Sequence, residues 1–330
     1  MSAPRERFAE IDALKVAGIV TIPLIHALRA PWDPAVAPLE VWIGHATRFA
    51  VPAFLFASGF LYATRERVAG STLRGRLRRI LLPYLLASLL AQAFRAATGH
   101  EGGVGDWWLD LLIGASFGPY YYVFVIVCLV LATPLFAALP ARLLPALLLL
   151  LAGLQWVTDA GALGWVDMRV HIRNPLLWWA YFLLGWCVRL HWPGVRRFAD
   201  AHRPLLLLTF GTAVVLLTAA SGLEGSAPRL AVRTAAWLDV YAILGLVFVA
   251  AGRMQRVPGW LRFTSDATYA LYLFHLFFLL PARWLWPQPD GAVTAAGILL
   301  PWAVALAGPL LLVLAAQTLL GARSRAWIGA

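Results

Sequence analysis

Residues 119–139 read PYYYVFVIVCLVLATPLFAAL, an apolar stretch that contains no charged side chain. A helix needs about 20 such residues to cross the hydrocarbon core of a bilayer, which is roughly 30 Å thick. Every backbone N–H and C=O inside a helix is bonded within the segment, so a helix can cross where water is absent. The stretch therefore predicts a transmembrane helix, and similar stretches recur along the chain.

The composition of the 330 residues agrees with a membrane location. Hydrophobic residues make up 61% and charged residues 13% of the chain, whereas a soluble domain has about 45–50% and roughly 25%. These values exclude both a soluble domain and an intrinsically disordered chain. The two cysteines, Cys128 and Cys187, are too few for a disulfide scaffold. The sequence indicates an integral membrane protein.

Ten segments are apolar enough to be predicted spans, although the fifth and sixth are short. They cover residues 13–30, 41–62, 79–97, 119–139, 142–157, 175–190, 204–220, 230–251, 267–286 and 293–320. We expect them to form an all-α, polytopic membrane helix bundle that is a single domain over residues 1–330.

The cationic residues predict the orientation of this bundle. The net charge is +11, and arginines are concentrated in the links that follow the second, sixth and eighth spans. Because cytoplasmic loops collect Lys and Arg, we place these links and both termini in the cytoplasm. The cations lie between apolar segments and not on one face, so topology explains the charge and no nucleic-acid partner is expected.

The link over residues 99–118 lies outside the cytoplasm in this topology. It carries Trp107 and Trp108 beside several acidic residues, and paired tryptophans are typical of a membrane interface. We expect a short interfacial helix here and not an eleventh span.

Six ionisable side chains fall within the predicted spans, where such groups are costly and commonly functional. Lys15 and His26 are eleven residues apart, close to three helical turns, so they share a face, with His26 about 16 Å nearer the outside. His45 and Arg48 are neighbours on one face of the second span. Together the six predict a polar pocket in the middle or outer half of the bundle; they are Lys15, His26, His45, Arg48, Asp239 and His275.

These side chains also have structural interpretations. His26 could tie two helices together with one hydrogen bond, and Arg48 could extend to the outer head groups. Asp239 could form an ion pair with Arg48, Arg233 or a histidine. The pocket alone fits an enzyme and a transporter equally well.

Four motifs, taken in order, resemble those of the acyltransferase-3 family of membrane O-acyltransferases. The similarity extends over nearly the whole chain, and YFLLG at residues 181–185 also fits. Each motif alone can recur by chance in apolar sequence, but four in the family's order are specific. They are FAEIDALKVAG at residues 8–18 with His26, Arg48-x-x-Val51-Pro52-x-Phe54 with Ser58-Gly59-Phe60, RRILLPY at 78–84, and TYALYLFH at 268–275.

The chain departs from the family pattern in three places. Ala13 replaces the usual glycine, and Lys15 replaces the commoner arginine, which keeps the charge but not bidentate recognition. The family often has His-Leu-Trp-Phe where this chain has Pro119-Tyr120-Tyr121-Tyr122. Any role of that family histidine is therefore not carried over.

The resemblance implies an enzyme of a bacterial cytoplasmic membrane. It would move an acyl group, most commonly acetyl, from cytoplasmic acyl-CoA to a hydroxyl of an extracytoplasmic saccharide or glycolipid, and no metal is expected. On this basis His26 is the predicted general base or transient acyl carrier. Arg48 would stabilise the oxyanion. His275 and Asp239 would orient these groups or bind the acceptor.

The chemistry of these substrates predicts the binding sites. Acyl-CoA phosphates would meet Lys15, Arg74, Arg76, Arg78 and Arg79, although the four arginines are equally well explained as a topology signal. The residues expected to bind the acceptor are His45, Ser58, Tyr121, Tyr122, Tyr269 and Tyr272. Further polar and aromatic side chains of the outer side suit a sugar but suit a membrane interface better; they are Trp107, Trp108, Trp165, Arg169, His171 and Arg173.

The main alternative is a transporter or flippase for a sugar-linked lipid or a small solute. It would use the same pocket and release its ligand unchanged. The sequence shows no internal repeat and no pair of interrupted helices, and the lack of these transporter features argues against this alternative. A purely structural subunit would need no cluster of buried charges. Expected partners are membrane lipid, the acceptor, and an enzyme of polysaccharide assembly that could act with the chain.

Overall fold

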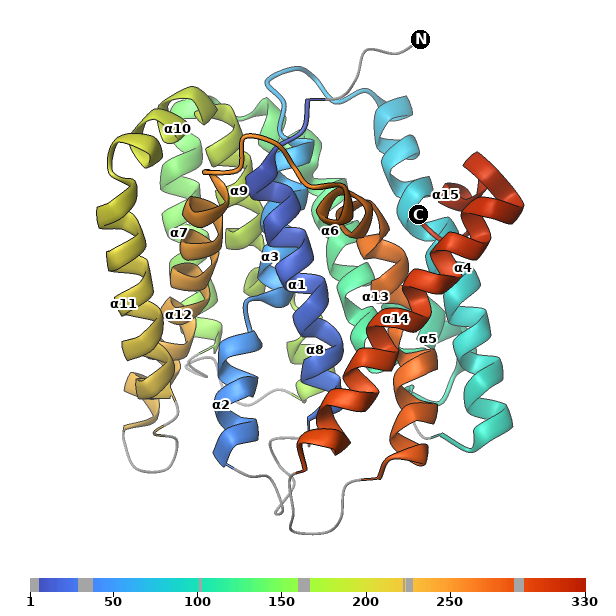
Figure 1. The fold of residues 1–330 in the computed structure, drawn as a ribbon. Coiled ribbons are helices and arrows are strands. Elements are labelled where there is room, and N and C mark those ends of the chain that lie inside the picture. Colours follow the sequence, from blue (N-terminus) through green and yellow to red (C-terminus); the bar gives the residue numbers. More distant parts are fainter. Residues whose placement is uncertain are drawn as a thin grey trace.

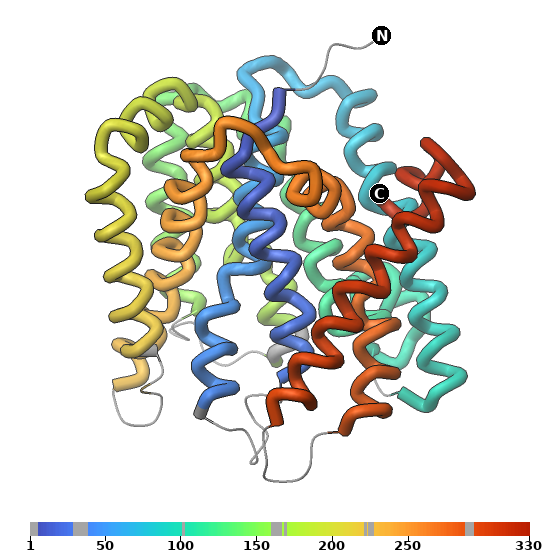
Figure 2. The backbone as a smooth tube through the Cα atoms, viewed as in Figure 1, coloured from blue at the N-terminus to red at the C-terminus, as the bar shows by residue number. Residues whose placement is uncertain are grey.

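The computed structural model describes residues 6–28, 38–100, 103–159, 167–221, 223, 228–287 and 294–330. Over these residues the regular structure is helical and contains no strand. Most of the long helices run side by side along one common direction, whereas α14 crosses them obliquely, as Figure 1 shows. The tube in Figure 2 follows the chain back and forth between the two ends of the bundle.

The helices follow one another with short links. They are α1 Ala9–Ala27, α2 Pro38–Thr47, α3 Ala50–Tyr62, α4 Gly70–Thr98, α5 Trp107–Ile113, η1 Gly118–Tyr120, α6 Tyr121–Ala138, η2 Ala141–Leu143, α7 Leu144–Asp159, α8 Met168–His171, η3 Pro175–Leu177, α9 Trp179–Leu190, α10 Trp192–Ala201, α11 Arg203–Ser221, α12 Arg229–Ala251, α13 Gly259–Leu285, α14 Ala295–Leu320, η4 Gly321–Arg323 and α15 Ser324–Trp327.

The predicted fold class is confirmed, but the predicted number of spans is not. Within the described residues, seven helical segments are long and apolar enough to cross a membrane. They include α4, α6, α7, α11, α12, α13 and α14. Three other predicted spans differ: α1 carries three charged residues near its start, the second is broken into α2 and α3, and α9 has 12 residues. The chain is a multi-pass, all-α membrane helix bundle.

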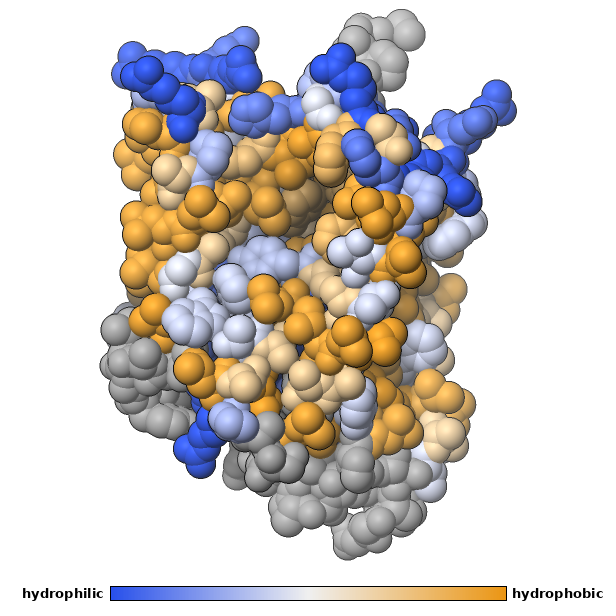
Figure 3. Space-filling model, turned by 90° about the vertical axis from the view of Figure 1, so that its left-hand side faces the viewer, coloured by the Kyte–Doolittle hydropathy of each residue, from blue (hydrophilic) through white to orange (hydrophobic). Residues whose placement is uncertain are grey.

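One end of the bundle is basic. The links between α3 and α4, α9 and α11, and α12 and α13 meet at the end where α1 begins (Figure 1). On the face drawn in Figure 3, hydrophilic side chains gather at this end above a broad apolar band, which is hollowed near its middle. The positive-inside rule assigns this end to the cytoplasm. The short helix predicted outside is present as the seven-residue α5.

The break between α2 and α3 was not predicted. A single helix over residues 41–62 was expected, but the helix stops at Thr47 and resumes at Ala50. Pro52 explains the interruption, because it has no N–H to donate to the carbonyl of Arg48 four residues earlier and its ring would collide with that carbonyl. The backbone N–H of Arg48 instead bonds the His45 carbonyl at 3.2 Å. The break places Arg48 between two half-helices.

Two glycines of the family motifs are explained by packing. A side chain at Gly59 on α3 would collide with the backbone carbonyl of Phe182, and one at Gly185 on α9 would collide with that of Phe56. The backbones of α3 and α9 therefore meet directly, as small residues allow in membrane helix pairs. This close pair, together with the centrally placed α1, forms much of the buried core.

Candidate active site

Two histidines from different helices face each other. His26, next to last in α1, and His275 of α13 have ring centroids 5.4 Å apart and planes 27° apart. His275 is fully buried, whereas His26 is partly exposed. The structure thus brings together two of the four predicted catalytic residues, and His26 is the one of the pair that keeps some exposed surface.

The hydrogen bonds of His275 leave one ring nitrogen unused. Its Nδ1 lies 2.7 Å from the backbone carbonyl of Tyr272, while Nε2 is buried and has no hydrogen-bond partner among the residues that the structure describes. A carbonyl oxygen only accepts hydrogen bonds, so Nδ1 must carry the proton and Nε2 is left with a lone pair. Buried polar atoms without partners are rare in folded proteins.

Tyrosines hold the segment of α13 that carries His275. The hydroxyl of Tyr272 donates to the carbonyl of Pro119, and the hydroxyl of Tyr120 donates to that of Leu273 at 2.5 Å. The Tyr122 ring packs edge-on against Tyr272 at 5.2 Å. These contacts fix α13 to the start of α6, beside the histidine pair.

The remaining residues predicted to bind the acceptor are spread more widely. Ser58 on α3 hydrogen bonds with Tyr122, whereas the Tyr269 hydroxyl donates to the Ile80 carbonyl on α4 at 2.7 Å. Tyr121 packs on Trp178 with ring centroids 5.8 Å apart. His45 is buried within α2. Only part of the predicted set therefore surrounds the histidines.

Arg283 is a cation beside the pair that the sequence analysis did not assign to the site. Its guanidinium donates to the backbone carbonyl of His26 at 3.3 Å. Arg283 lies eight residues after His275 on α13, about two helical turns, which places both on one side of that helix. That spacing after the TYALYLFH motif is the signal that could have identified it.

Arg48 and Asp239 form a second polar region. Asp239 on α12 is 2% exposed, and one carboxylate oxygen accepts a hydrogen bond of 2.9 Å from Thr218 on α11. Arg48 is close enough to Asp239 for an electrostatic interaction. Of the partners predicted for Asp239, Arg48 is the one nearby, whereas Arg233 donates to the backbone of Asp159. Within the described part of the chain, the other oxygen of Asp239 has no hydrogen-bond partner.

Aromatic and amide groups adjoin this second region. The Tyr241 hydroxyl donates to the Gln155 side chain at 3.0 Å, and the rings of Tyr181 and Tyr241 are 5.0 Å apart. Arg48 also interacts electrostatically with Tyr181. Gln155 is buried on α7. It was not predicted as a site residue, because a single amide in an apolar helix has no distinguishing spacing.

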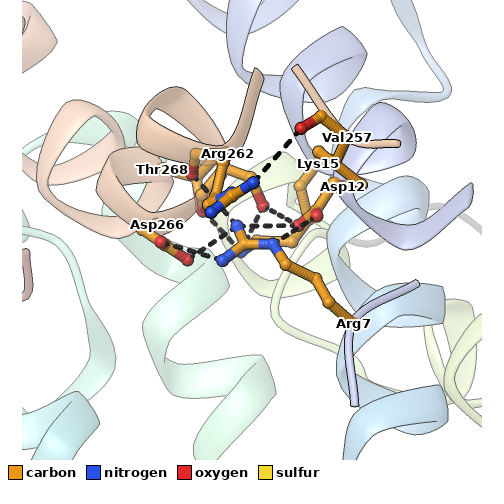
Figure 4. A network of polar contacts seen from close by, with 8 residues as sticks. Arg7, Asp12, Lys15, Val257, Arg262, Asp266 and Thr268 are labelled. Atoms are coloured by element: carbon orange, nitrogen blue, oxygen red, sulfur yellow. Dashed lines mark hydrogen bonds and ion pairs between the residues drawn. The ribbon is translucent and has the colours of Figure 1, made fainter. Parts of the chain in front are cut away.

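Lys15 lies in a network near the cytoplasmic end, drawn in Figure 4. Its ammonium group donates to the hydroxyl of Ser265 at 3.0 Å and to the carbonyl of the same residue. Ser265 in turn donates to Asp12 at 2.5 Å, and Arg7 bridges Asp12 and Asp266. We call these five residues, Arg7, Asp12, Lys15, Ser265 and Asp266, the inner network.

Arg7 lies before α1 and closes the inner network. Partial burial by itself would lower the pKa of its guanidinium, but the hydrogen bonds to Asp12 and Asp266 outweigh this effect and raise the pKa above its ordinary value. Arg7 also donates to the carbonyl of Arg262 in α13. The first turn of α1 is therefore attached to α13 by charge-assisted hydrogen bonds.

The four arginines of α4 divide into two kinds. Arg74, Arg78 and Arg79 are exposed at the cytoplasmic end of the helix. Arg76 turns inward, where it donates to Thr133 and to the Tyr62 carbonyl, both at 3.3 Å, and lies over the Tyr62 ring. Three of the four can meet a soluble anion directly.

The link between α4 and α6, which contains α5, is held on the outer side by two arginines. Asp110 on α5 pairs with Arg95 at 3.0 Å, and Arg173 donates to the carbonyls of Ile113 and Gly114 at 2.8 and 3.0 Å. Trp107 and Trp108 are exposed, as interfacial residues would be. Trp165 and the side chain of Arg169 lie outside the described residues, and His171 is partly exposed on α8.

Fold and site together define a class of protein: a multi-pass membrane bundle with a partly buried imidazole pair and a basic cytoplasmic end. A family model described as an acyltransferase domain matches residues 8–320. The match covers nearly the whole chain, which therefore belongs to the acyltransferase-3 family of membrane acyltransferases. No curated protein and no solved structure matches the chain.

Proposed function

We propose that the protein transfers an acyl group, most simply acetyl, from cytoplasmic acyl-CoA to a hydroxyl of an extracytoplasmic saccharide or glycolipid. Membership of the family supplies the acyltransferase activity. The single observation that carries the finer proposal is the His26–His275 pair, with rings 5.4 Å apart and the His26 ring partly exposed. A neutral imidazole is the group best suited to accept a proton near pH 7.

In this proposal the donor binds at the basic end. The exposed guanidinium groups of Arg74, Arg78 and Arg79 would bind CoA phosphates, because arginine pairs with phosphate through charge-assisted hydrogen bonds. Arg76 and Lys15 lie deeper and hold protein groups. Their role is to fix the helices between which the pantetheine arm would pass. His26 lies about 16 Å from Lys15 along α1, further toward the outside.

The chemistry follows from the partly exposed ring of His26. The acceptor oxygen forms a bond to the acyl carbon as the carbon–sulfur bond breaks. The hydroxyl proton passes to His26 and then to the departing CoA thiolate, so the products are an ester and free CoA. A positioned base of this kind contributes typically 10²–10⁴-fold in rate.

A cation must stabilise the negative charge that develops on the acyl oxygen. Arg48 is the candidate from sequence, and Arg283 is the guanidinium that contacts His26. The acceptor would bind on the outer side, where Tyr121 and Trp178 offer aromatic rings that pack against each other and the region around Arg48 and Asp239 offers hydrogen-bonding groups. Because the hydroxyls of Tyr269 and Tyr272 bond backbone carbonyls, these two tyrosines would position helices instead of holding the acceptor.

The test is acyl transfer by the purified protein in lipid nanodiscs. We expect labelled acetyl-CoA to yield free CoA and an acetylated saccharide. We also expect His26→Ala to lower the rate by at least about 10²-fold. His191→Ala is the control, because His191 is an exposed histidine that directly follows α9 at the cytoplasmic end, where its Nδ1 lies 2.9 Å from the Cys187 carbonyl. Near-normal transfer by His26→Ala would refute the assignment.

The acceptor can be found in cells. Mass spectrometry of envelope polysaccharides from cells with and without the gene should show the loss of one acyl mass. Movement of a sugar-linked lipid or solute by the protein without any acyl transfer would instead support the transporter or flippase.

A further inference from the structure

The position of His275 suits a residue that orients the neighbouring His26 and does not itself contact a substrate. Its ring is fully buried, and the only group of the pair that reaches the surface is His26. Its Nδ1 is committed to the Tyr272 carbonyl at 2.7 Å, so the tautomer is set by the backbone of its own helix. The lone pair on Nε2 therefore lies inside the protein, and no described residue donates a hydrogen bond to it.

The surroundings hold this lone pair in place. Tyr272 is anchored to Pro119, and Leu273 accepts a hydrogen bond from Tyr120, so the backbone turn that fixes His275 is held from a second helix. The Tyr272 hydroxyl is used in that bond and cannot serve Nε2. Among the described residues, the polar ring that stacks on His275 is that of His26, with centroids 5.4 Å apart.

We propose that His275 is the positioning residue for His26: its Nε2 accepts a ring N–H of His26 when substrates are bound. The inference rests on the proposed function and deepens it. Catalytic hydrogen bonds are often long in a free enzyme and tighten only in the substrate complex. A rotation of the partly exposed His26 ring would form this bond. The other nitrogen of His26 would then be the one that lacks a proton and faces the acceptor hydroxyl.

This arrangement gives His26 a defined tautomer without a carboxylate. In serine hydrolases a buried aspartate holds the catalytic histidine in the correct tautomer, and its loss costs about 10⁴-fold in rate. Here the backbone carbonyl of Tyr272 orients His275, and His275 orients His26. A neutral acceptor avoids burying a carboxylate in the membrane interior, where an ionised group is expensive.

Two substitutions test the roles of the two ring nitrogens of His275 separately. His275→Gln places an amide carbonyl near the position of Nε2 and so keeps an acceptor for His26. His275→Asn places an amide N–H near the position of Nδ1 and so keeps the bond to Tyr272 while the acceptor is lost. We expect His275→Asn to lower kcat by about 10²-fold or more, with KM for acetyl-CoA unchanged. We expect His275→Gln to stay within about tenfold of the natural enzyme, because an amide oxygen also accepts a hydrogen bond. Equal losses in both variants, or a larger loss in His275→Gln, would overturn the proposal.

A second measurement does not depend on transfer activity. Nitrogen NMR of protein labelled at histidine in nanodiscs reports which ring nitrogen carries the proton. We expect His275 as the Nδ1–H tautomer, and we expect one tautomer of His26 with acetyl-CoA bound that becomes a mixture in His275→Asn. A proton on Nε2 of His275, or a His26 tautomer that does not respond to His275→Asn, would overturn the proposal. If these NMR results appear but no saccharide is acylated, the acceptor assignment fails while the positioning role stands.

Discussion

The inner network and the histidine pair connect the same two helices at different depths, but they differ in how many of their polar atoms have hydrogen-bond partners. Near the cytoplasm, Asp12 and Lys15 of α1 meet Ser265 of α13 with hydrogen bonds of 2.5–3.0 Å. Further out, the rings of His26 of α1 and His275 of α13 are stacked, and Nε2 of the buried His275 has no hydrogen-bond partner among the described residues. The polar side chains of the inner network are thus paired with one another, whereas the histidine pair has an unused hydrogen-bond acceptor.

This difference separates a structural role from a chemical one. Leaving a buried acceptor unpaired costs about 1–3 kcal/mol of folding stability. The unpaired Nε2 of His275 therefore does not stabilise the fold, and its use would lie in a hydrogen bond that forms when a ligand is bound. A saturated charged network, in contrast, holds one arrangement of helices. The inner network therefore sets the distance between α1 and α13 for the histidines eleven and ten residues further along.

The largest effect is expected from removing Asp12. Asp12→Ala would leave the half-buried Lys15 without this counter-ion and Arg7 with Asp266 alone. Breaking a fully buried pair typically costs about 3–5 kcal/mol, and the partial exposure of Arg7 places the expected loss toward the lower end. We expect a clearly lower thermal-unfolding midpoint in detergent or nanodiscs. Asp266→Ala is the control, since its side chain is 57% exposed and an exposed pair contributes about 1 kcal/mol or less. Similar midpoints for the two variants would contradict the structural role of the inner network.

A smaller effect is expected from the exposed arginines of α4. Replacing Arg78 and Arg79 together with alanine should raise KM for acetyl-CoA about tenfold, equivalent to about 1.4 kcal/mol, and leave kcat nearly unchanged. Titration calorimetry or initial rates at varied acetyl-CoA would measure this. Arg256→Ala, another exposed arginine of the same end, should leave KM unchanged. If Arg256→Ala raises KM as much, the effect is general surface charge and not a phosphate site.

The sequence predicted the helical membrane fold because apolar length is a sufficient signal for a span. It also selected His26 and His275, since an ionisable group in an apolar helix stands out. It did not predict the break at Arg48, because the effect of Pro52 on the preceding turn competes with an apolar pattern that continues through it. Nor could it show that Lys15 donates to Ser265 or that Arg283 donates to His26, because each hydrogen bond joins residues more than 200 positions apart in the sequence.

The smallest effect is expected from Ser265→Ala. The hydroxyl of Ser265 links Lys15 to Asp12, but Lys15 keeps the Ser265 backbone carbonyl and Asp12 keeps Arg7 after the hydroxyl is removed. A single hydrogen bond contributes about 1 kcal/mol net, so we expect a small fall in the unfolding midpoint and a rate of acyl transfer within about twofold of the natural protein. In a double-mutant cycle with Asp12→Ala the losses should be less than additive, because both changes remove the same bond. A large loss of transfer with no loss of stability would mean that the inner network takes part in the chemistry, and the division between a saturated support and an unsaturated site would no longer hold.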